Sequence, residues 1–166
     1  MKSPNLTPMN DVRSLERKYA KQIKWHIQKS LPALHEKFCK LKMSSDYADS
    51  NLCYDLTYGL HFQISVRIRK YSYLKFGDMT IRYKSKANMS TEFNKIADGY
   101  AQIYFYAYES QKQDDLVKVR IVDVNSIRKM IEEKNYTVRT NYDGTELAAF
   151  SFSKIKELGG AIYQYD

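Results

Sequence analysis

The chain has 166 residues, 43% of them hydrophobic, and its 27 lysines and arginines outnumber its 19 acidic residues, giving a net charge of +8 at pH 7 and a pI near 9.3. The length suits a single domain over residues 1–166, no run approaches the roughly 18 apolar residues of a membrane span, and residues 1–10 lack the apolar region of a secretory signal. We therefore predict a cytoplasmic protein that does not use a membrane, with a polyanion as its favoured partner, although the charge also suits a merely soluble surface.

Helical periodicity dominates the first quarter of the chain. Apolar residues recur at spacings of three and four from Val12 to Leu41, which indicates one continuous stripe on a helix. We predict a disordered N-terminus at residues 1–10 and then a long helical segment over residues 11–42, packed on the core. Ser30 followed by Pro32 is typical of a second N-cap with proline in the first turn, so we expect a kink or a restart there.

The periodicity then changes from helical to alternating. Residues 61–70 alternate strictly between apolar and polar side chains, which predicts a strand. Residues 52–58 are expected to form its partner strand across a turn at Gly59, and a third strand is expected over residues 78–83. A short helix over residues 92–97 follows, with Ser90 or Thr91 as its N-cap.

The second half of the chain is predicted to be rich in strands. Residues 100–108 are almost uniformly apolar or aromatic, which suggests a central strand covered on both faces. The remaining predicted elements are a strand over residues 117–124, a helix capped by Asn125 or Ser126, two strands around a turn at residues 143–144, a helix near residues 154–158 and a last strand over residues 161–165. We predict an α/β (α+β) fold, with a single mixed β-sheet flanked by helices.

Several phrases of the sequence resemble a known family. They are YDLTYG at 54–59, FQISVRIRKY at 62–71, GDMTIR at 77–82, TEFNKIADGYAQIYFYAY at 91–108, VDVNSIRKMI at 122–131 and GTELAAFSFSKIKEL at 144–158. With the αβββαβ order, they resemble the restriction-endonuclease-like core of the PD-(D/E)xK nuclease superfamily. Within it, the chain is similar to small phage and bacterial proteins of unassigned role. The resemblance implies such a core with a long N-terminal helix and a strand-rich C-terminal tail.

The resemblance also implies a magnesium-dependent active site. In the superfamily, an aspartate on one strand and a glutamate or glutamine on the next bind Mg²⁺, which polarises the phosphodiester and lowers the pKa of the attacking water. Asp55 matches the aspartate, and Gln63 matches the second ligand. Glu92 is a candidate compensating carboxylate, and Glu16 is a weaker third one.

The lysine of the superfamily motif is missing from its usual place. Ser65 occupies that position, and the nearest cation on the same face is Arg67, which can hold a phosphate but does not readily transfer a proton. Lys95, on the helix that follows, is the candidate for a lysine that has moved. The implied function is therefore a Mg²⁺-dependent DNA endonuclease, or else a catalytically inactive relative that binds DNA or, as an inhibitor or accessory factor, a protein partner.

Each of these residues also has a purely structural interpretation. Asp55 suits a turn or an edge strand, Glu92 suits the first turn of a helix, where an acid is favoured by the helix dipole, and Lys95 suits a solvated helix surface. A two-fold homodimer would suit cleavage of both DNA strands, although no residue of the sequence points to one.

Cations and tyrosines alternate over residues 67–86. Cations neutralise phosphates, and aromatic rings stack on unpaired bases with about 1–3 kcal/mol per base. The predicted nucleic-acid-binding residues are Arg67, Arg69, Lys70, Tyr71, Tyr73, Lys75, Arg82, Lys84 and Lys86. Tyrosine also fills sheet faces, and for Tyr104, Tyr106 and Tyr108 we favour that packing role.

Overall fold

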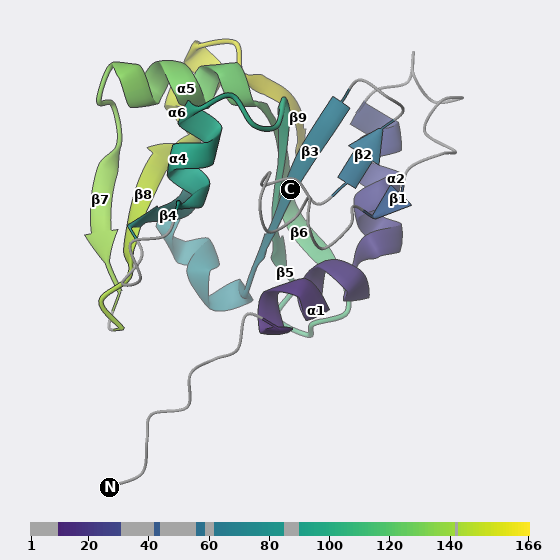
Figure 1. The fold of residues 1–166 in the computed structure, drawn as a ribbon. Coiled ribbons are helices and arrows are strands. Elements are labelled where there is room, and N and C mark those ends of the chain that lie inside the picture. Colours follow the sequence, from purple (N-terminus) through teal and green to yellow (C-terminus); the bar gives the residue numbers. More distant parts are fainter. Residues whose placement is uncertain (1–9, 31–41, 44–55, 59–61, 85–89, 142) are drawn as a thin grey trace, which may run out of the picture.

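A computed structural model describes residues 10–30, 42–43, 56–58, 62–84, 90–141 and 143–166 (Figure 1). The predicted α/β (α+β) class, with a mixed sheet flanked by helices, is confirmed. One part of the prediction is wrong, because the strands divide between a six-stranded and a three-stranded sheet. Alternation along a strand shows which side chains share a face, but it does not show which strand is the neighbour. No described helix is long and apolar enough to span a membrane.

The expected third strand of the αβββαβ order, residues 78–83, does not lie in the six-stranded sheet. That sheet instead begins with a short strand at residues 42–43 that was not predicted, followed by strands within the predicted ranges 52–58 and 61–70. Its first three strands form an antiparallel meander, and the chain then returns through a helix to a strand that is parallel to the third, with Ile64 opposite Ile103. In spatial order, its strands are β1 (Lys42–Met43), β2 (Leu56–Tyr58), β3 (Phe62–Arg69), β5 (Ile103–Glu109), β6 (Leu116–Asp123) and β9 (Ala161–Tyr165).

The three-stranded sheet is built from the insertion after β3 and from the C-terminal part of the chain. It is antiparallel, and its strands in spatial order are β4 (Asp78–Lys84), β8 (Glu146–Ser151) and β7 (Thr137–Thr140). A short connection, the 3-10 helix η3 (Tyr71–Phe76), leads from β3 into β4. Gly77 ends η3 in the left-handed region, with a φ of 63°, where a residue without a Cβ is favoured.

The predicted N-terminal helix is confirmed for the part that the structure describes. It consists of α1 (Asn10–Lys18) and α2 (Ala20–Ser30). The two meet at Tyr19, where backbone hydrogen bonds of helical spacing continue through the junction. The expectations for residues 1–9 and for the kink at Pro32 lie outside the described residues.

The other helices begin where side chains satisfy their first free N–H groups. Thr91 caps α4 (Glu92–Ala97) in a reciprocal pair with Asn94, as the sequence predicts. The prediction for α5 (Val124–Glu132) is wrong by two residues, because Asp123 is the cap and accepts from the Asn125 N–H at 2.9 Å. The last helix, α6 (Phe152–Glu157), begins after Ser151.

The six-stranded sheet carries an apolar core on each face. Figure 1 shows α1 and α2 on one side of it, and α4, α5, α6 and the three-stranded sheet on the other. All seven residues of β5 are buried, which confirms the predicted central strand. Tyr104, Tyr106 and Tyr108 are at most 2% exposed, which confirms their predicted role in packing.

The approach of β9 to α5 depends on one glycine. Gly160 accepts a hydrogen bond from the Asp123 N–H, and a Cβ at this position would overlap the Ser126 side chain. We expect Gly160→Ala to lower the free energy of unfolding by about 1–3 kcal/mol, as overpacked sites do. Urea unfolding measures the change. In a Ser126→Gly background the same substitution should have a much smaller effect, and an equal effect would contradict the steric explanation.

Candidate functional site

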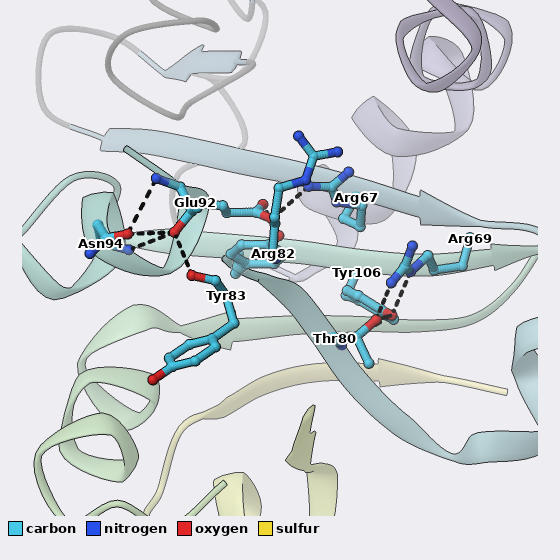
Figure 2. A network of polar contacts seen from close by, with 10 residues as sticks. Arg67, Arg69, Thr80, Arg82, Tyr83, Glu92, Asn94 and Tyr106 are labelled. Atoms are coloured by element: carbon cyan, nitrogen blue, oxygen red, sulfur yellow. Dashed lines mark hydrogen bonds and ion pairs between the residues drawn. The ribbon is translucent and has the colours of Figure 1, made fainter. Parts of the chain in front are cut away.

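The central feature of the site is an ion pair between Arg67 and Glu92, two residues of the predicted active site. Arg67 extends from β3, and Glu92 is the first residue of α4. Their side chains meet with 2.5 Å between Nη2 and Oε2, and only 19% and 9% of their side-chain surfaces are exposed (Figure 2). The structure therefore brings these two predicted residues together, but it pairs them with each other.

Glu92 is the more completely satisfied partner. Its Oε1 accepts from the Tyr104 hydroxyl, and its Oε2 also accepts from the Arg82 N–H at 3.4 Å. Burial alone would raise the pKa of this carboxyl, but the Arg67 charge and these hydrogen bonds outweigh burial and hold the pKa below its ordinary value. Glu92 is therefore ionised at neutral pH, and its oxygens are committed to protein donors.

Two acidic side chains act on the charge of Arg67. The Glu92 carboxylate raises the pKa of its guanidinium, burial opposes this rise, and the charge of the buried Glu16 on α1 adds to it. The Nε of Arg67 is buried and has no hydrogen-bond partner among the residues that the structure describes. Because the Glu92 carboxylate neutralises its charge and only 19% of its side chain is exposed, Arg67 is less available to a phosphate than an exposed cation.

The predicted magnesium ligands do not assemble a site in the described part of the chain. Gln63 is the second residue of β3. Its backbone N–H donates to the Gln102 side chain, its backbone carbonyl accepts from the Gln102 N–H, and its side chain can offer an ion one neutral oxygen. Glu92 is engaged by Arg67 and Tyr104, and no group of three or more His, Cys, Asp or Glu side chains among the described residues could hold a metal ion. Asp55 lies outside the described residues, so the ligand roles of Asp55, Gln63 and Glu92 stay predictions.

The position of the missing lysine and the candidate for a displaced lysine lie on the same two elements as Arg67 and Glu92. Ser65, at the position of the missing lysine, is 2% exposed on β3. Lys95 lies three residues after Glu92 on α4 and is half-buried. Its predicted role as a displaced catalytic lysine stays a prediction.

A second polar network joins β3 and β5 to β4. The Arg69 guanidinium donates to the Tyr106 hydroxyl at 3.2 Å and to the Thr80 hydroxyl, as Figure 2 shows. Next along β5, the Tyr108 hydroxyl donates to the Asp78 backbone carbonyl at 2.9 Å. These contacts fix the start of β4, and with it the position of η3.

Asp78, which is not among the predicted site residues, contributes a buried carboxylate at the start of β4. Its Oδ2 pairs with Arg139 of β7 at 2.5 Å, while its Oδ1 is buried without a hydrogen-bond partner among the described residues. Burial raises the pKa of this carboxyl, and the Arg139 charge works in the opposite direction. Arg139 lies more than 50 residues beyond the predicted strip, so only the pairing of β7 with β8 and β4 brings it there.

The predicted nucleic-acid-binding strip separates into engaged and exposed residues. Arg67 and Arg69 are held in the two networks, whereas the other described members have exposed side chains. These are Lys70, Tyr71, Tyr73 and Lys75 at η3, and Arg82 and Lys84 on β4. Lys86 lies outside the described residues. Phe76, which is 50% exposed, was missed, although its place between Lys75 and Gly77 in the same strip could have revealed it.

Comparison with known proteins gives one structural relative to report. No protein-family model matches the chain, and no curated protein matches its sequence. Among solved structures, the chain is similar to D212, a nuclease from a fusselovirus, with a TM-score of 0.43 and 14% sequence identity over 95% of this chain and 92% of that one. A TM-score this low does not by itself establish a common fold.

The buried ion pair predicts a pH-dependent stability. Because Glu92 has a lowered pKa in the folded protein, its contribution is complete above its ordinary pKa of 4.5 and is lost as the pH falls through the folded value. We expect Glu92→Gln to reduce the free energy of unfolding by about 3–5 kcal/mol at neutral pH, since it leaves the Arg67 charge buried without its partner. This loss should shrink below pH 4.5.

Urea unfolding of wild type and Glu92→Gln across that pH range measures the difference. Glu157→Gln is the matched control, because Glu157 is an exposed carboxylate whose ion pair with Lys154 lies at the surface. A loss in Glu92→Gln that is small, or that does not depend on pH, would contradict the stabilising ion pair.

Proposed function

We propose that this protein acts on nucleic acid, and that it binds its substrate through the exposed cations and aromatic rings at η3. The supporting observation is the group of Lys70, Tyr71, Tyr73 and Lys75, which all expose their side chains on one short connection. The net charge of +8 supports a polyanionic partner of this kind.

We further propose that the protein is nuclease-like, of the PD-(D/E)xK type. The order of its central elements and the parallel pairing of β3 with β5 support this proposal. In the catalytic version, Asp55 and Gln63 belong to the site of a Mg²⁺-dependent DNA endonuclease. The donors that the structure describes do not by themselves complete a metal site.

The second candidate is a catalytically inactive relative that binds nucleic acid or a protein. The Arg67–Glu92 pair favours it, because the pair neutralises one predicted phosphate-binding cation and one predicted ligand together. The burial of Ser65 at the position of the family's lysine favours it as well. Binding is therefore the function that the geometry supports best, and cleavage is the property that most needs a direct test.

Cleavage of supercoiled and single-stranded DNA with Mg²⁺ or Mn²⁺ tests the catalytic version. We expect nicking, if it occurs, to require the metal and to be lost in Asp55→Ala, because a carboxylate is needed to hold the ion. The control is Asp98→Ala, which removes an exposed carboxylate beyond α4. Nicking that survives in Asp55→Ala would contradict the assigned site.

A binding titration at two salt concentrations tests the broader proposal. Affinity should fall as salt rises, with a slope of about 0.7 per phosphate contact for single strands and about 0.9 for duplex DNA on a log–log plot. Salt-sensitive binding without nicking would support the inactive relative. Absence of both activities would contradict a nucleic-acid function and leave a protein partner to be found.

A further inference from the structure

The exposed aromatic rings of η3 have the arrangement of a stacking surface. Tyr71, Tyr73 and Phe76 expose 42%, 37% and 50% of their surfaces, and no residue of η3 is buried. Large apolar side chains are seldom exposed together on a single short turn. We name Lys70, Tyr71, Tyr73, Lys75 and Phe76 of this segment, together with Arg139, the η3 platform.

The 3-10 geometry of the segment places two of these rings side by side. Residues three apart in a 3-10 helix are aligned on one face, and Tyr73 and Phe76 have this spacing. Their ring centroids are 6.4 Å apart, with the planes inclined at 44°. The two rings therefore form one continuous aromatic surface.

Three cations lie over the faces of these two rings. The Arg69 guanidinium lies 5.2 Å from the Tyr73 centroid, while Lys75 Nζ and the Arg139 guanidinium lie 5.2 and 5.3 Å from that of Phe76. The two arginines are held in place from behind, Arg69 by Thr80 and Tyr106, and Arg139 by Asp78. The positive charge over the rings is thus built into the fold.

We infer that the η3 platform binds unpaired nucleotides, with bases stacked on Tyr73 and Phe76 and phosphates held by Lys70, Lys75 and Arg139. The inference rests on the proposed function and specifies its substrate class. An aromatic ring needs an open base face, which a single strand, loop or frayed end offers and a continuous duplex does not. Cations alone would bind both forms, so the exposed rings are what favour the unpaired form.

The test compares the affinities of the full-length protein for fluorescein-labelled oligothymidylate and for a blunt-ended duplex closed by G·C pairs, which has no loop. The ring variant is Tyr73→Leu/Phe76→Leu, which keeps apolar bulk but removes both aromatic faces. We expect it to bind the single strand about five- to a hundredfold more weakly and the duplex almost unchanged. The charge variant, Lys70→Ala/Lys75→Ala, should weaken both and lower both salt slopes.

Tyr100→Leu is the matched control, because Tyr100 is also 37% exposed. It precedes the N-terminal end of β5, whereas η3 follows Arg69, which pairs with Tyr108 near the C-terminal end of β5. Thermal unfolding of each variant verifies that the fold is intact. Equal weakening of both ligands by the ring variant, or no change in single-strand affinity, would overturn the inference while leaving nucleic-acid binding in place. If the wild type binds neither ligand, the proposed function and this inference both fail.

Discussion

Three tyrosines on the central strand impose the constraint on which the rest of the site depends. Tyr104, Tyr106 and Tyr108 are buried, and a buried hydroxyl is costly unless it has a hydrogen-bond partner. Their partners are, in order, Glu92, Thr80 and the backbone of Asp78. Because these three hydroxyls need hydrogen-bond partners, the start of α4 and the first half of β4 are held against the six-stranded sheet.

The two sites follow from that constraint. At one end, Tyr104 holds Glu92 where it meets Arg67, and the resulting ion pair neutralises the cation that faces the predicted active site. At the other end, the contacts of Tyr106 and Tyr108 with β4 hold η3 at the surface. The hydroxyls of these three tyrosines thus stabilise both the buried Arg67–Glu92 ion pair and the exposed, positively charged η3. The proposed binding function is therefore better supported than cleavage.

The sequence predicted the individual helices and strands better than the way in which they pair and pack. Period-two alternation located β3, and the Thr91 cap located α4, because both signals depend on near neighbours. The division into two sheets and the contact of Arg139 with Asp78 depend on pairing between distant strands, which no local pattern encodes. For the same reason, Arg67 was predicted as a free phosphate ligand, since its partner Glu92 is 25 residues away.

Amide hydrogen exchange with and without oligothymidylate tests the proposed binding of nucleic acid at η3 most directly. The short η3 turn has no buried residue and should exchange readily in the free protein. The account predicts that the oligonucleotide slows exchange over residues 70–77 more than elsewhere. Slowing confined to other surfaces, such as α2 and β9, or unchanged exchange at a concentration that saturates binding, would contradict it.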